Sequence, residues 1–170
     1  MKDFIIKNGV LKEYTGQGGD VFILAGVTDI ADWAFKKCKN PYSITIPMGV
    51  TNIGEHAFDC TTLQGITVNE KNSVYRSENN CLIERKNNQL ILGCQNSRIP
   101  DTITSIRHSA FYGCEKLKSI TIPNGVTSIE NGTFTGCKSL QSVTIPDSVT
   151  TIGSQAFQGC SNLQSITIPR

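Results

Sequence analysis

A repeat of about 23 residues constrains the fold of this chain more than any other feature of its sequence. Five repeats carry a phenylalanine at the same position, and these are Phe35, Phe58, Phe111, Phe134 and Phe157. A second marker, the last apolar residue of each expected strand, recurs in step at Ile23, Ile46, Val68, Ile99, Ile122, Ile145 and Ile168. A sustained period between about 20 and 29 residues is typical of a solenoid, in which each unit stacks on the next.

One repeat unit shows why stacking is needed. The residues from Ser119 to Ile122 alternate polar and apolar, which predicts a strand with one buried face. Pro123 then ends the strand, and the following Asn-Gly pair turns the chain. No single unit encloses the apolar residues that it carries. Each unit must therefore bury its apolar edge against its neighbours, and the sequence predicts a mostly β repeat solenoid.

The recurring string I-x-x-I-x-x-x-A-F-x-G-C-x-x-L-x-S-I-x-I-P-x-x-V resembles the BspA-like leucine-rich repeat. The resemblance runs from about Val21 to Pro169, with departures such as Leu24 in place of the proline and Thr133 in place of the alanine. It implies a curved leucine-rich-repeat solenoid with a parallel sheet on one side. It also implies a bacterial or protozoal cell-surface protein that binds other macromolecules and is not an enzyme.

Two stretches depart from the repeat and predict β-hairpins. Residues 4–14 carry Asn8-Gly9 at their centre, which is a strong turn signal, and we expect this hairpin to cap the solenoid. In the longer middle unit, strands at 81–85 and 90–94 flank Asn87-Asn88. This second hairpin either projects from the array or bridges two blocks of repeats.

A single domain over residues 1–170 accounts for the whole chain. We expect a hairpin cap at 1–20, a first repeat block at 21–68, a hairpin insertion at 69–98 and a second repeat block at 99–170. The net charge of +2 gives no reason to expect nucleic acid as a partner. No apolar run approaches the roughly 20 residues of a membrane helix, so we expect no membrane insertion.

Seven cysteines form two sets, and neither predicts a metal site or a cofactor. The first set shares one position in the unit and comprises Cys38, Cys60, Cys114, Cys137 and Cys160. Parallel side chains one unit apart do not converge on a tetrahedral ion, so we expect them to pack as small buried residues. The second set is Cys81 and Cys94, whose numbers sum to 175 about a turn centred on Asn87-Asn88. This numbering places them directly opposite each other as a non-hydrogen-bonded pair, in which the Cα atoms are about 4.5 Å apart. The pair is therefore either a candidate disulfide or two packed thiols.

Catalytic motifs are absent from the sequence. His56 and His108 occupy variable polar positions of two units that are not neighbours, so we expect both side chains to be solvated. No phosphate-binding loop, nucleophile elbow or HExxH motif occurs. We therefore expect no enzyme activity.

Binding remains as the predicted function. The outward positions of the strands form columns of Ser and Thr, which either contact an extended ligand or simply favour strand formation. The candidate ligand contacts are the exceptions to these columns and residues beside the middle hairpin, namely Phe22, Tyr42, Tyr75, Arg76, Arg98 and Lys118. We expect a recognition or adhesion module that binds protein or glycan through its exposed sheet or middle hairpin. An intracellular scaffold or structural repeat protein is the alternative.

Two further expectations concern location and assembly. The family resemblance implies a cell-surface or secreted protein, whereas the first residues lack an export signal and leave the cytoplasm as the alternative. The strand expected from Ser165 to Ile168 has a neighbour on one side only. An open strand edge invites pairing, so we expect either a longer array or an end-to-end homodimer.

Overall fold

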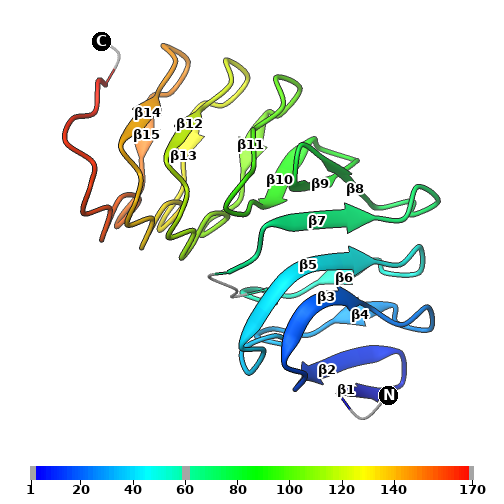
Figure 1. Ribbon diagram of the computed structural model, residues 1–170. Helices are drawn as coiled ribbons and strands as arrows, with labels where there is room; N and C mark the ends of the chain where they lie inside the picture. The colour runs from blue at the N-terminus through cyan, green and yellow to red at the C-terminus, as the bar shows by residue number, and fades with distance from the viewer. Residues whose placement is uncertain (1–2, 59–61, 169–170) are drawn as a thin grey trace.

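The computed structural model describes residues 3–58 and 62–168, which form a curved, mostly β solenoid (Figure 1). No helix occurs within these residues. The strands are β1 (Phe4–Lys7), β2 (Val10–Tyr14), β3 (Gly18–Phe22), β4 (Asp29–Ile30), β5 (Asn40–Ile46), β6 (Asn52–Ile53), β7 (Gly65–Val68), β8 (Tyr75–Glu78), β9 (Cys81–Glu84), β10 (Gln89–Leu92), β11 (Ser105–Ile106), β12 (Ser119–Thr121), β13 (Ser128–Ile129), β14 (Ser142–Thr144) and β15 (Thr151–Ile152).

The repeats stack their strands in two columns. The long strands form one column, with β3, β5 and β7 in one sheet and β12 and β14 in another. The short strands form the other column, in the orders β2-β4-β6 and β13-β15. Neighbours within both columns run parallel, and Phe22 pairs with Thr45, which pairs with Thr67. The predicted solenoid and its parallel sheet are therefore confirmed.

The recurring phenylalanines form a stacked ladder inside the solenoid. Phe111 and Phe134 are fully buried, and their ring centroids are 5.3 Å apart. Phe134 stacks on Phe157 at 5.4 Å, whereas Phe35 and Phe58 in the first half lie 5.1 Å apart with their ring planes tilted by 40°. Because each ring contacts the equivalent ring of the next unit, the period of the sequence becomes the period of the core.

Each half of the solenoid begins with a hairpin. β1 pairs antiparallel with β2, and both residues of the Asn8-Gly9 turn have positive φ, at 52° and 76°. β9 pairs antiparallel with β10 in the middle of the chain. In both hairpins the second strand pairs in parallel with the first short strand of the next unit. These pairs are β2 with β4 and β10 with β11.

The middle hairpin bridges two hydrophobic cores. One core runs from Leu11 to Val68 and includes Leu82 of β9. The other includes Ile83 of the same strand and continues through the second half to Ala156. Because adjacent residues of a strand point to opposite faces, β9 contributes to both cores at once. The hairpin therefore joins the two halves and does not project from the array.

The register predicted for the middle hairpin is wrong. Gln89 pairs with Glu84, so the connection is longer than the expected two-residue turn, and a bulge follows between Leu90 and Leu92. The ladder to β10 ends where Leu92 pairs with Leu82, one residue out of step with the register expected for Cys81 and Cys94. On its other edge, Cys81 pairs with Glu78 of β8. A third strand, β8, pairs with the outer edge of β9 and was not expected from the sequence.

Two of the seven expected long strands do not form. Residues 96–99 and 165–168 have no ladder partner, although they occupy the positions of strands in the repeat. The first segment follows the middle hairpin, and its N–H groups bond elsewhere: Ser97 donates to the carbonyl of Cys94 and Arg98 to that of Asn79. Just before it, Gln95 donates to the carbonyl of Leu63. The second segment has a described neighbour on one side only.

Candidate binding groove between the two halves

A groove opens in the column of long strands where the two halves meet. One wall is the segment 95–99, and the other is the segment 116–121, which contains β12. Figure 1 shows the long strands changing direction between β7 and β12, the two strands that flank this region. The groove has a volume of about 790 Å³, within the range of roughly 300–1,000 Å³ that is typical of ligand sites.

The walls of the groove carry three cations and no carboxylate. Arg98 extends from one wall, and Lys116 and Lys118 extend from the other. All three residues are exposed, and none belongs to an ion pair among the described residues. The nearby Glu115 pairs with Lys138 at 2.8 Å. The structure thus brings together Arg98 and Lys118, two of the predicted contact residues.

Sequence reasoning missed Gln95 and Lys116. Gln95 is buried, and its Oε1 accepts a hydrogen bond of 2.6 Å from the backbone N–H of Lys116 across the groove. This side chain occupies a place where neighbouring units elsewhere form backbone hydrogen bonds. No signal in the repeat pattern marks either residue, because the groove exists only where the pattern is interrupted.

The other predicted contact residues are dispersed. Phe22 and Tyr42 lie on the exposed face of the first sheet, with 66 % and 56 % of their surface accessible. Tyr75 is buried at 6 %, so its ring cannot serve as an exposed contact and that prediction is wrong. Arg76 forms an ion pair with Glu78, which fixes it along β8.

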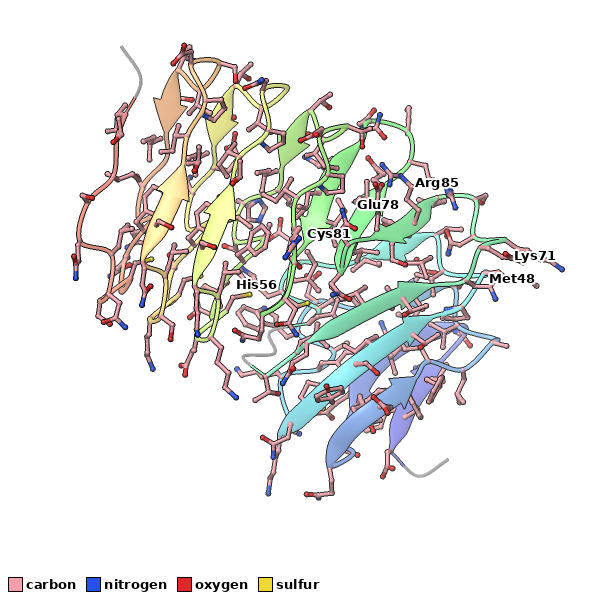
Figure 2. All side chains as sticks on the ribbon, turned by 45° about the horizontal axis from the view of Figure 1, so that its top comes forward. Met48, His56, Lys71, Glu78, Cys81 and Arg85 are labelled. Atoms are coloured by element: carbon pink, nitrogen blue, oxygen red, sulfur yellow. The ribbon has the colours of Figure 1, made fainter. Side chains whose placement is uncertain are left out.

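The two histidines meet although their units are not adjacent in sequence. Their ring centroids are 6.4 Å apart, and the imidazole of His56 also stacks on the indole of Trp33 at 4.5 Å. His108 lies 3.6 Å from a carboxylate oxygen of Glu55. Figure 2 places His56 at the junction of the two halves, whereas Lys71 extends from a turn at the outer edge. Neither histidine is buried, and the His108 side chain is 42 % exposed, but the two rings lie in one cluster that includes Tyr112, whose ring meets His56 edge-on.

The described cysteines are free thiols. Cys137 is fully buried, and its Sγ donates to the carbonyl of Phe111 at 3.2 Å. Cys160 repeats this contact one unit later with Phe134 at 3.1 Å. The expected packing of the cysteine column is thus confirmed for its buried members, whereas Cys60 lies outside the described residues.

Cys81 and Cys94 are also free and buried. They belong to different cores, and the observed hairpin register differs from the one that suggested a candidate disulfide or two packed thiols. A disulfide between them stays a prediction about the oxidised protein. Burial raises the pKa of the Cys81 thiol to about 12, which disfavours the thiolate that oxidation requires.

The described part of the chain holds no metal-binding constellation. No group of three or more His, Cys, Asp or Glu side chains there is placed to hold an ion. Nor do those residues form a helix that is long and apolar enough to cross a membrane.

The architecture defines a leucine-rich-repeat solenoid. A model of the BspA type leucine-rich repeat region matches residues 19–92 and 91–170 in six copies, and the chain belongs to this family. Comparison with curated protein sequences gave no match. Repeat proteins of this kind generally mediate protein recognition and typically act as non-catalytic scaffolds, and BspA-like members are typically surface-associated in bacteria.

Several solved structures share this fold. A leucine-rich repeat protein from Eubacterium ventriosum is 30 % identical with a TM-score of 0.75, and the match covers 88 % of this chain and 41 % of that one. A leucine rich cell surface protein from Faecalibacterium prausnitzii is 28 % identical with a TM-score of 0.59, covering 88 % and 53 %. The pneumococcal vaccine antigen PcpA is 18 % identical with a TM-score of 0.68, covering 89 % and 51 %. The chain thus spans about two fifths to one half of these relatives.

Proposed function

We propose that this chain is a non-catalytic recognition or adhesion module of cell-surface type that binds a protein or glycan partner. The observation that carries the proposal is the groove, which interrupts the regular sheet of long strands. Among the described residues, its three cations Arg98, Lys116 and Lys118 have no carboxylate partner. The resemblance to a leucine rich cell surface protein supports the location.

The proposal is tested by comparing two substitutions on the same column. The immobilised chain is screened against extracellular-matrix proteins and a glycan array, and the affinity for each hit is then measured for Arg98→Ala and Thr144→Ala. Arg98 provides five donors in a rigid fork and a large contact area, whereas the Thr column is redundant. Weaker binding for Arg98→Ala alone supports the groove. Equal affinities, with circular dichroism unchanged, contradict it.

An intracellular scaffold is the second candidate function. Its specific support is the set of six described cysteines, all of which are free thiols, a state typical of reducing compartments. Fractionation of cells that express the native gene separates the two functions. Recovery in the soluble cytoplasmic fraction favours the scaffold, and surface labelling of intact cells favours the recognition module.

A further inference from the structure

Strand β12 presents an unpaired backbone edge to the groove. On its other side, the N–H of Ile122 donates to the carbonyl of Thr144 at 2.9 Å, in step with the ladder to β14. Alternate residues of a strand bond to opposite sides, so the N–H and C=O groups of Ser119 and Thr121 point toward the groove. No backbone hydrogen bond joins these two residues to the described segment 95–99.

The groove occupies the place of a missing ladder. Arg98 stands 23 residues before Thr121 and is its counterpart in the repeat, just as Thr121 precedes and pairs with Thr144. Arg98 and Thr121 face each other across the groove without pairing. One end of the groove is bridged by Gln95, whose side chain bonds the backbone of Lys116 at 2.6 Å. Toward Thr121, the edge of β12 is open, and another polypeptide segment can lie between the two walls of the groove.

The charge of the groove selects the side chains of that segment. Three cations line the walls, and no carboxylate is among the lining residues. An acidic partner is therefore complementary in charge, and mismatched basic segments are repelled. The backbone edge adds a second criterion, since its donors and acceptors alternate with the spacing of another β-strand.

We propose that a protein partner adds an extended acidic segment as a strand on the edge of β12. This inference rests on the proposed recognition function and names its ligand. Backbone hydrogen bonds to Ser119 and Thr121 supply the affinity, and Asp or Glu side chains on one face of the added strand meet Arg98 and Lys118, which supply the specificity. An acidic glycan satisfies the charges but cannot continue the ladder.

The test uses three probes that separate backbone pairing from charge. The first is a fluorescein-labelled peptide of alternating Asp and Val, and the second carries N-methyl groups on alternate residues of the same sequence. The third is a heparin hexasaccharide. Anisotropy titrations are expected to show that the first peptide binds and that the affinity of the methylated peptide is lower by about tenfold or more. Amide hydrogen exchange at Ser119 and Thr121 is expected to slow only when the first peptide is bound.

Matched variants locate the site. We expect the affinity for the first peptide to fall by about tenfold or more in Arg98→Glu and in Lys118→Glu, because each substitution converts attraction into repulsion. Lys71→Glu makes the same charge change on an exposed lysine outside the groove, and binding is expected to persist. Circular dichroism of all three variants checks that the fold is retained.

Each contrary outcome overturns strand addition. Equal affinities for both peptides mean that the groove recognises charge alone. Binding of the hexasaccharide that depends on Arg98, without binding of either peptide, means that the groove is a glycan site. The proposed recognition function is retained in both cases. Exchange at Ser119 that slows with protein concentration alone means that a second copy fills the edge. Failure of all three probes also rejects the inference, while the proposed function is decided separately by the comparison of Arg98→Ala with Thr144→Ala.

Discussion

Leu11 and Leu90 occupy the same structural position in the two halves of the solenoid. Both are fully buried, and both lie in the second strand of a hairpin. Leu11 pairs in parallel with Ile30, and Leu90 pairs in the same way with Ile106. The chain is thus built from two arrays that each start from a hairpin, and the groove lies where the second array begins.

Leu90→Ala should destabilise the second half more than the first. Deleting a fully buried leucine side chain costs roughly 2–5 kcal/mol, and repeat units interact mainly with their neighbours. Hydrogen exchange is expected to accelerate over residues 103–156, with Leu11→Ala as the matched variant that acts on the first half. Uniform acceleration across the chain in both variants would instead mean that the two cores unfold as one unit.

Asn72→Ala should lower the free energy of unfolding by about 2–4 kcal/mol, because orphaned buried polar groups cost roughly 1–3 kcal/mol each. Asn72 is 2 % exposed, and its Nδ2 donates to the carbonyls of Pro47 and Val50 at 3.0 and 2.9 Å. Its Oδ1 accepts from the N–H of Tyr75 at 2.7 Å. Urea denaturation measures the loss.

The matched control for Asn72 is Asn69→Ala, three residues earlier. Asn69 is exposed, and its side chain accepts a single hydrogen bond from the N–H of Lys71 at 3.0 Å. We expect a loss below about 1 kcal/mol, since water replaces that bond. A similar loss in the two variants would show that the buried network at Asn72 adds nothing.

Stability should fall in alkaline solution. Burial raises the pKa of the Cys81 and Cys137 thiols from 9.0 to about 12. The unfolded chain releases these protons above pH 9 while the folded chain retains them, so this contribution is complete below pH 9 and is lost between pH 9 and about 12. Urea midpoints across this range are expected to fall less steeply for Cys137→Ala. Identical slopes would exclude a role for this thiol.

The stacked pair at Trp33 and His56 provides an optical test of the junction. Trp33 is the only tryptophan, so all indole fluorescence comes from this residue. His56→Ala removes a ring whose plane lies within 12° of the indole, and the emission is expected to shift to longer wavelength as water replaces it. His108→Ala serves as the control, because its ring contacts His56 and not Trp33. The same spectrum from both variants would argue against the stacking.

Self-association through the last unit stays a prediction. Ile152 and Ile168 are 37 % and 58 % exposed there, and exposed apolar surface favours association. Light scattering at tens of micromolar is expected to detect a dimer, and Ile168→Lys should return the chain to a monomer. A monomeric unmodified chain rejects the prediction, and a dimer that persists in Ile168→Lys places the contact elsewhere.

The sequence by itself determined the repeat, the parallel sheet of long strands and the positions of the two hairpins. These features depend on local signals: a period of 23 residues aligns Phe22 with Thr45, alternation selects the buried face, and Asn8-Gly9 supplies positive φ. Each unit meets a near copy of itself, so the register of neighbours follows directly from the spacing.

Only the tertiary structure decided what happens where the repeat is interrupted. The middle hairpin does not follow the register expected from its turn residues, and its strand β9 also pairs with β8 and contributes to two cores. That register leaves segment 95–99 bonded to earlier residues, opens the groove beside β12 and brings His56 next to His108. These are contacts between segments far apart in the chain, and their geometry depends on the packing of side chains that no local pattern specifies.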